Sequence, residues 1–164
     1  MNGVYVGRFS PLHKGHMSVI DIMQEECTDC MLLIGSSAST RTIKTPFNYF
    51  ERKTFIKSIY PDICLQGIPD VIGDDAIWIS MLDDICNCTF GTTDVTFYGG
   101  SEADVSFFYD YGKKVKIIDR SIIPISATAI RQLMMLGQDI TPFVSDKIAK
   151  RVVSHFQEIM KEEW

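Results

Sequence analysis

Short apolar runs alternate along the chain with longer segments in which apolar residues recur every three or four positions. The short runs have the length of buried strands and are rich in β-branched and aromatic residues. They lie at 4–6, 31–34, 63–65, 95–98 and 114–118. The longer segments predict amphipathic helices, the first of which carries Met17, Ile20 and Met23 at helical spacing.

Capping and stop signals bound the next two helices. Thr45 before Pro46 predicts an N-cap followed by proline at the first helical position, in a helix that ends near Tyr60. Asp74 or Asp75 would cap the following helix. Its buried stripe would be Ile77, Met81 and Ile85, with Trp78 and Leu82 beside it.

Three further helices are predicted in the second half of the chain. A short one spans about 102–109, and a second is capped by Ser126 and closes near Gly137. The last begins near Ser145, and its buried side would carry Ile148, Val152, Phe156 and Ile159.

The alternation of strands with helices predicts an α/β fold. We expect a parallel sheet of about five strands with helices on both faces, formed by a single domain over residues 1–164. The C-terminal helices, at about 126–162, would pack on the sheet. Right-handed crossovers would bring the strand-to-helix loops to the carboxyl edge of the sheet, where open α/β folds bind ligands. These loops are 7–16, 35–45, 67–75 and 99–101.

Composition narrows the class of partner. The chain of 164 residues is 46% hydrophobic and 23% charged, with a net charge of −5 and no basic block, so neither nucleic acid nor a membrane is an expected partner. The absence of a signal peptide or an apolar span predicts a cytoplasmic location. A polyanionic ligand would need locally concentrated cations. The candidates are Arg8, Lys14, Arg41, Lys44, Arg52 and Arg131.

Five cysteines in a chain with no sign of secretion predict reduced thiols. Cys27 and Cys30 have CxxC spacing, but they follow the first helix, whereas a redox pair normally lies at a helix N-terminus, where the thiol pKa is lowered. Cys86 and Cys88 have poor spacing for the second half of a zinc site. Ordinary packing is therefore the favoured interpretation, with redox chemistry as the alternative.

The segment from Gly7 to His16 has the pattern of a phosphate-binding loop. A strand runs into a loop and then a helix, whose first amides lack partners within the helix. Arg8 and Lys14 supply positive charge. His13 at the end of the loop and His16 in the first helical turn would converge on one anion, and Gly15 would allow close backbone approach.

A second anion clamp is predicted at 125–131. Ser126 and Thr128 place hydroxyls and amides at a helix N-terminus, and Arg131, three residues beyond Thr128, lies on the same helix face. Taken alone, this segment would also suit a capped helix with an exposed arginine.

The two segments together resemble the HxGH and ISxTxIR motifs of the nucleotidyltransferase superfamily. Gly7–His16 is similar to the longer form found in archaeal-type nicotinamide-mononucleotide adenylyltransferases. The resemblance implies a Rossmann-like domain that joins ATP to nicotinamide mononucleotide (NMN), giving NAD and pyrophosphate by direct in-line attack on the α-phosphate. It also implies catalytic roles for His13, His16 and Arg131. Mg²⁺ would be bound mainly through the ATP phosphates, with no protein metal site. The implied ATP-binding residues are Gly7, Arg8, Phe9, His13, Gly15, His16, Ser126, Thr128 and Arg131.

Two further blocks resemble the acceptor side of these enzymes. Residues 35–52 are similar to a GSA…NPF…ER block in which Thr45 here replaces the usual asparagine. Residues 68–70 with Trp78 resemble an IPD…WV block, which implies that Trp78 stacks on the nicotinamide ring, although packing in the core is the alternative. Arg52 is either a phosphate ligand or a solvated surface charge. The acceptor-binding candidates are Trp78, Ser36, Arg41, Lys44 and Asp70.

Three alternatives stay open. The acceptor could instead be phosphopantetheine, or glycerol phosphate with CTP. The chain could be a sensor of NAD or ATP without turnover, or a redox protein that uses its CxxC pair. Since many relatives are oligomers, a homo-oligomer is compatible with the resemblance, but no interface is predicted.

Overall fold

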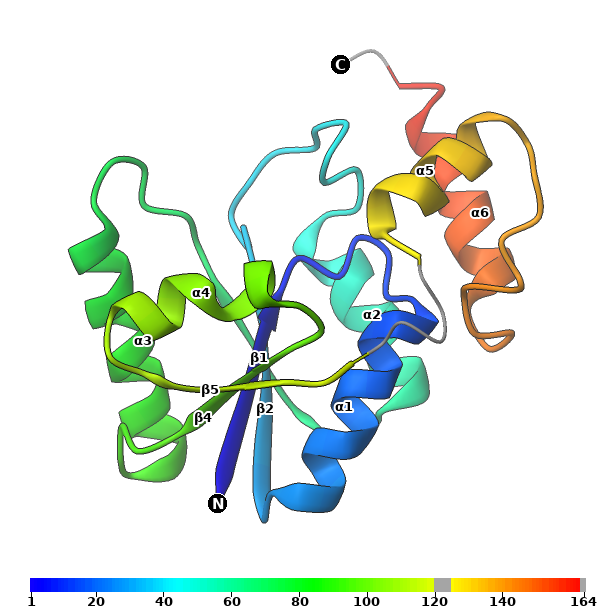
Figure 1. The fold of residues 1–164 in the computed structure, drawn as a ribbon. Coiled ribbons are helices and arrows are strands. Elements are labelled where there is room, and N and C mark those ends of the chain that lie inside the picture. The colour runs from blue at the N-terminus through cyan, green and yellow to red at the C-terminus, as the bar shows by residue number, and fades with distance from the viewer. Residues whose placement is uncertain (120–124, 163–164) are drawn as a thin grey trace.

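The computed structural model describes residues 1–119 and 125–162. Five strands alternate with helices through most of the chain, and two more helices follow the last strand (Figure 1). The elements are β1 (Asn2–Gly7), α1 (Lys14–Glu26), β2 (Asp29–Gly35), α2 (Tyr49–Ile59), β3 (Cys64–Ile68), α3 (Asp75–Phe90), β4 (Thr96–Gly99), α4 (Glu102–Asp110), β5 (Lys114–Ile117), α5 (Ala127–Met135) and α6 (Ala149–Ile159).

The strands form one parallel sheet in the order β3-β2-β1-β4-β5, which confirms the predicted α/β fold. The chain winds outward from β1 to β3 and then returns to place β4 on the other side of β1. The strand order therefore reverses between β1 and β4, and in open α/β sheets ligands bind at the carboxyl ends of the strands at such a point.

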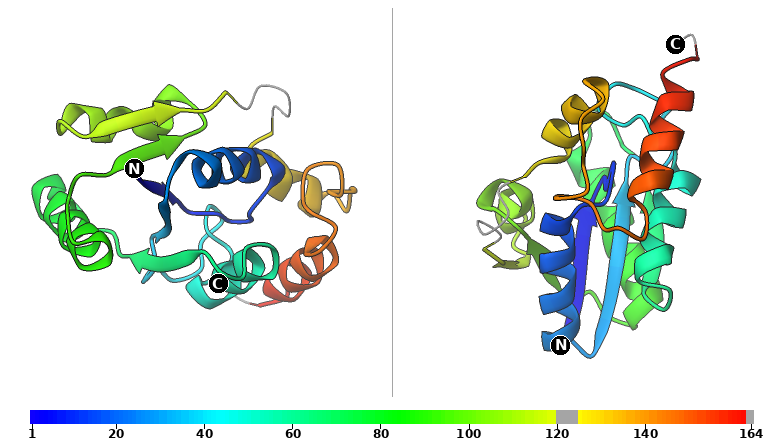
Figure 2. Two further views of the ribbon diagram at one scale, coloured as in Figure 1. Left: turned by 90° about the horizontal axis from the view of Figure 1, so that it is seen from below. Right: turned by 90° about the vertical axis from the view of Figure 1, so that its right-hand side faces the viewer.

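Two apolar cores cover the two faces of the sheet, because successive strand residues point to opposite sides. Tyr5 belongs to the core shared with α1, α2, α5 and α6, whereas its neighbour Val4 belongs to the core shared with α3 and α4. Figure 2 shows this layering along the strands, with α1 and α2 on one side of the sheet and α3 on the other. The prediction of helices on both faces is confirmed.

Helix α2 begins later than predicted. Its N-cap is Asn48, whose side chain accepts a hydrogen bond from Glu51 N at 2.8 Å, while Glu51 Oε1 accepts from Asn48 N at 3.1 Å. The prediction of Thr45 as the N-cap was wrong, because this reciprocal capping box fixes the first turn three residues further on. Thr45 is instead buried in the preceding loop, where its backbone pairs with Thr42.

Other boundaries shift for similar local reasons. Asp74 caps α3, but the buried line along that helix is Leu82 and Cys86, with Trp78 half-buried in front of them and Ile77 exposed. Two apolar lines one residue apart both fit helical spacing, and only packing against the sheet selects one. β3 extends through Ile68, into the predicted loop at 67–75.

The C-terminal helix also starts later, at Ala149 rather than near Ser145, while its predicted buried residues are confirmed. They join the core that α1 and α2 share. Within residues 1–119 and 125–162, no helix is both long and apolar enough to cross a membrane.

Candidate active site

The β1–α1 loop closes onto its own helix through two histidines. His13 is the N-cap of α1, and its Nδ1 accepts hydrogen bonds from Gly15 N at 3.0 Å and His16 N at 3.3 Å. In return, His13 N donates to His16 Nδ1 at 3.1 Å. The two rings stack with centroids 3.6 Å apart. The structure brings His13 and His16 together, with both residues buried, and their convergence on one anion stays a prediction.

This capping arrangement selects the histidine tautomer. A ring nitrogen that accepts a hydrogen bond from a backbone N–H carries no proton, so the neutral rings of His13 and His16 hold their proton on Nε2. Double protonation would place a second proton on Nδ1 and break the first turn of α1. The geometry therefore favours two neutral imidazoles whose Nε2–H groups are hydrogen-bond donors.

Phe9 packs against this histidine pair. Its ring lies 4.9 Å from that of His16 and 5.2 Å from that of Tyr5, and it is 1% exposed. A Cβ on Gly7 would come within 3.0 Å of the Phe9 ring, which explains the glycine at the end of β1. Because Phe9 as a whole is buried, its ring serves to pack against His16.

Helix α5 brings the second motif to the same loop. Ser126 caps α5 by accepting from Ala129 N at 3.1 Å, and Thr128 Oγ1 accepts from Arg131 Nη2 at 3.2 Å. Arg131 Nη1 donates to Ser10 O at 2.9 Å, across 121 residues of sequence. The two motifs predicted separately from the sequence therefore meet at the carboxyl end of β1.

Three guanidinium groups, those of Arg8, Arg52 and Arg131, share this region, and Asp70 and Glu51 are the carboxylates that act on Arg52. Burial lowers the pKa of Arg131, and the nearby Arg8 lowers it further. Burial is also the main cause of the lowered pKa of Arg52, to which Arg8 again contributes. Among the described residues, none of the three forms an ion pair. Such an excess of positive charge favours an anionic ligand.

Arg52 itself differs from both predicted roles. It is fully buried, and its donors bond to the backbone carbonyls of Arg8, Gly35, Ser36 and Asn48. It is therefore neither a solvated surface charge nor a side chain directed at a phosphate. Sequence reasoning missed this because backbone carbonyl partners leave no signal in the amino-acid sequence.

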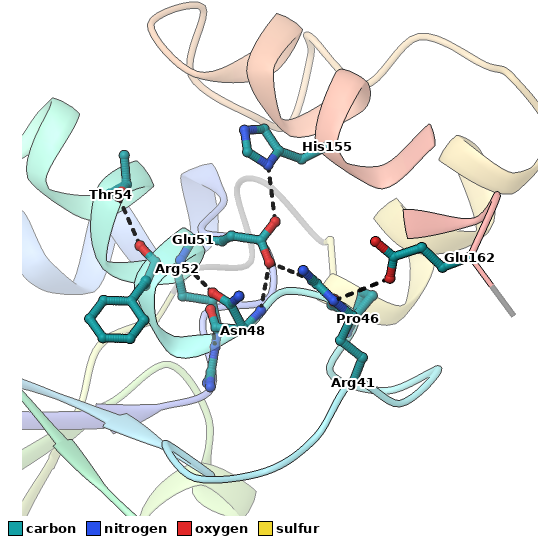
Figure 3. Close-up of polar contacts among 9 residues, drawn as sticks. Arg41, Pro46, Asn48, Glu51, Arg52, Thr54, His155 and Glu162 are labelled. Carbon is teal, nitrogen blue, oxygen red and sulfur yellow. Dashed lines mark hydrogen bonds and ion pairs between the residues drawn. The ribbon is translucent and has the colours of Figure 1, made fainter. Parts of the chain in front are cut away.

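The β2–α2 loop is held by a network around Glu51 (Figure 3). Glu51 accepts hydrogen bonds from Arg41 and lies 3.0 Å from His155 Nδ1 on α6. Arg41 also donates to Pro46 O at 2.9 Å and approaches Glu162 at 3.7 Å. Arg41 is thus engaged within the protein. The spacing of Asn48 and Glu51 is a capping-box signal that could have identified this network in the sequence.

The other acceptor candidates lie on neighbouring loops. Ser36 Oγ donates to Asp70 Oδ2 at 2.8 Å, which joins the loop after β2 to the loop after β3. Lys44 is exposed on the β2–α2 loop. Trp78 is half-buried and packs edge-on against Phe107, with ring centroids 5.6 Å apart. Its contacts with α4 show that Trp78 is at least partly a packing residue.

Two residues of these loops have strained backbones. Phe9 and Ser36 both have φ of 50°, in the left-handed region that side chains other than glycine rarely adopt. Each costs about 1–2 kcal/mol. Phe9 lies two residues after the end of β1, and Ser36 directly follows β2. Strain of this kind collects at functional sites, where the surrounding structure maintains it.

Comparison with known proteins identifies the family. The nicotinamide-nucleotide adenylyltransferase of Pyrococcus abyssi is 31% identical over 97% of this chain and 84% of its own length. The chain belongs to the nicotinamide-nucleotide adenylyltransferase family. A model of the cytidylyltransferase-like family also matches residues 4–78, which include the histidine loop.

Solved structures share this fold. A bifunctional NMN adenylyltransferase/ADP ribose pyrophosphatase from Francisella tularensis superposes with a TM-score of 0.82 at 20% identity, over 99% of this chain. The chain spans half the length of that protein. The same bifunctional protein complexed with AMP and a manganese ion gives a TM-score of 0.78 at 21% identity.

The side chains that could bind a metal ion are not grouped at this site. In residues 1–119 and 125–162, no three or more His, Cys, Asp or Glu side chains are grouped so that they could hold a metal ion. The positive charge of Arg8, Arg52 and Arg131 would also oppose a cation bound to the protein alone.

Proposed function

We propose that the chain transfers the adenylyl group of ATP to NMN and releases pyrophosphate. A phosphate oxygen of NMN attacks the α-phosphorus of ATP, and the bond from that phosphorus to the bridging oxygen of the β-phosphate breaks. The electron pair of the broken bond leaves with pyrophosphate, and the new P–O bond completes NAD. The acceptor brings its own nucleophile, so no protein side chain needs to be covalently modified.

The observation that carries this proposal is the contact of Arg131 with Ser10 O. It joins an anion-binding helix N-terminus on α5 to the cationic loop before α1, and together they suit a triphosphate better than a single phosphate. Arg131, Ser126 and Thr128 would bind the β- and γ-phosphates. Arg8 and the backbone of Gly7 would bind the nucleotide beside them.

His13 and His16 would act as neutral donors. Their Nε2–H groups would stabilise the negative charge that builds on the α-phosphate oxygens as the attacking oxygen approaches, with Gly15 allowing the phosphate close to the helix. Donors already locked by the capping box need no reorganisation during the reaction. The nucleotide substrate would enter as Mg·ATP, in which the ion neutralises phosphate charge.

The acceptor would lie across β1 and β2 on the other side of the histidine pair. Lys44, exposed on its loop, would attract the phosphate of NMN, and Arg41 would hold that loop through Glu51. Ser36 and Asp70 would offer polar contacts to the ribose. Trp78 would stack its remaining exposed surface on the nicotinamide ring.

Pyrophosphate release from Mg·ATP with a panel of acceptors tests this function. The panel contains NMN, nicotinate mononucleotide, phosphopantetheine, and glycerol phosphate with either ATP or CTP. Release that depends on NMN, with NAD formed in equal amount, is the expected result. Release only with phosphopantetheine or glycerol phosphate would reject the acceptor, and nucleotide binding without any release would point to a sensor.

A further inference from the structure

Arg52 contacts both of the loops that would hold the two substrates. Its Nη1 donates to Arg8 O at 3.0 Å and to Gly35 O at 2.7 Å, and its Nη2 donates to Ser36 O at 3.0 Å. Arg8 lies 44 residues away in sequence and follows β1, whereas Gly35 ends β2 and Ser36 directly follows it. One buried side chain of α2 therefore connects the nucleotide loop to the acceptor loop.

These carbonyls belong to the two strained turns. Arg8 directly precedes Phe9, and Gly35 directly precedes Ser36, the two non-glycine residues with φ of 50°. In a trans peptide unit the C=O and the following N–H point in opposite directions. By holding the carbonyls of Arg8 and Gly35, Arg52 directs the N–H groups of Phe9 and Ser36 away from itself.

The chemistry of the side chain suits this task. A guanidinium presents five N–H donors in a rigid plane, so it can satisfy carbonyls that approach from several sides. A lysine ammonium is a single point and cannot reach all of them at once. Figure 3 shows Glu51 directed at His155 and Arg41 while Arg52 leaves the same turn of α2 in another direction, away from that network.

We propose that Arg52 is a positioning residue that sets the geometry of both substrate loops by holding the backbone on each side of their strained turns. This role rests on the proposed adenylyl transfer. Ser36 extends it further, because its hydroxyl donates to Asp70 at 2.8 Å on the loop that leads to Trp78. Arg52 touches no substrate itself, and its effect reaches ATP and the acceptor through the same carbonyl bonds.

The test is steady-state kinetics of Arg52→Lys, at a temperature at which circular dichroism shows the variant folded. We expect KM to rise for both ATP and NMN and kcat to fall, so that kcat/KM decreases by about tenfold to a hundredfold, because small displacements of substrate-holding groups have large effects on rate. A purely structural arginine would lower the melting temperature and leave both KM values of the folded enzyme unchanged.

Arg151→Lys is the matched control. Arg151 Nη2 ties α6 to α2 by donating to Ser58 Oγ at 2.8 Å, and it contacts neither substrate loop. Its KM values should equal those of the wild type.

As a second readout, guanidinium at non-denaturing concentration should restore part of the activity of Arg52→Ala. Arg52→Lys with both KM values and kcat within about twofold of wild type would overturn the proposal.

A measurement without substrates separates this inference from the proposed function. Amide hydrogen exchange of 7–13 and 35–48 should become faster in Arg52→Lys and stay unchanged in α3, whatever the reaction is. If both loops exchange at the same rate in Arg52→Lys as in the wild type, the positioning role is rejected, even if NMN-dependent release is found. If Arg52→Lys does not fold, the same comparison is made in a Ser36→Gly background, where glycine tolerates the positive φ. Unchanged loop exchange there would equally reject the role.

Discussion

The two edges of the sheet differ in the kind of polar group that they carry. At the carboxyl edge, the ends of β1 and β2 have strained turns and three arginines, Arg8, Arg52 and Arg131, that form no ion pair within residues 1–119 and 125–162. At the amino edge, a cavity of about 550 Å³ lies between the end of α1 and the starts of β2 and β3, and its lining includes Cys27, Cys30 and Cys64. Cavity size and thiol content would favour the amino edge as the site.

Cys30 at the amino edge has the wrong electrostatics for redox chemistry. Burial, with a smaller contribution from the neighbouring Cys27, raises the pKa of Cys30 to about 11. Cys27 Sγ donates to Tyr98 Oη at 3.4 Å, and Cys30 Sγ donates to Met23 O at 3.5 Å. Nucleophilic cysteines need a lowered pKa. The proposed site is thus distinguished by clustered arginines and backbone strain rather than by the volume of a cavity.

The largest effect is expected at the histidine pair. His16→Ala should lower kcat by about 10²-fold or more, because it removes a donor aimed at developing phosphate charge and opens the capping box of α1. Pyrophosphate release measures it, with circular dichroism as the check on folding. Gln157→Ala, at an exposed position of α6, is the control and should stay within about twofold of wild type. Near-normal turnover of His16→Ala would remove it from the site.

Arg131→Ala tests whether the α5 motif belongs to the same edge. Charged hydrogen bonds of this kind contribute about 1.5–3 kcal/mol, so kcat/KM for ATP should fall by about tenfold or more. KM for NMN should change less, since Arg131 contacts the nucleotide loop through Ser10 O. If kcat/KM for ATP is unchanged, Arg131 takes no part in the use of ATP, and the contrast between the two edges is weaker.

Trp78→Leu tests the acceptor side with a smaller expected effect. Leucine keeps an apolar side chain against Phe107 but cannot stack on an aromatic ring, so KM for NMN should rise by about two- to tenfold while KM for ATP stays unchanged. Thermal unfolding reports the packing contribution separately. A lower melting temperature with an unchanged KM for NMN would assign Trp78 to the core alone.

The amino edge should give the smallest effect. The double variant with Cys27→Ala and Cys30→Ala should keep the kinetics of wild type and lose only about 1 kcal/mol or so of stability, because buried thiols pack as small apolar groups. Since the pKa of Cys30 is raised to about 11, its thiol is protonated at neutral pH, and alkylation should accelerate only as the pH approaches that value. Loss of adenylyl transfer in the double variant would contradict the placement of the site at the carboxyl edge and favour the amino edge.

Local patterns in the sequence predicted the strands, the order of the elements and the segments that resemble HxGH and ISxTxIR, because short apolar runs, capping residues and these motifs each lie within a few neighbouring residues. The sequence also carried the signal for the Asn48 cap, although the proline after Thr45 gave a competing one. The choice between adjacent apolar lines on α3 could not be predicted, because both have helical spacing and only the sheet distinguishes them.

The hydrogen bonds that join the loops at the carboxyl edge depend on the tertiary structure. Arg131 reaches Ser10 across 121 residues, and Arg52 reaches Arg8 across 44, in both cases through backbone carbonyls that every residue possesses. No local pattern of side chains therefore indicates which backbone carbonyl accepts the hydrogen bond. The burial of Arg52 follows from where α2 lies against the ends of β1 and β2, and that position depends on the packing of both cores.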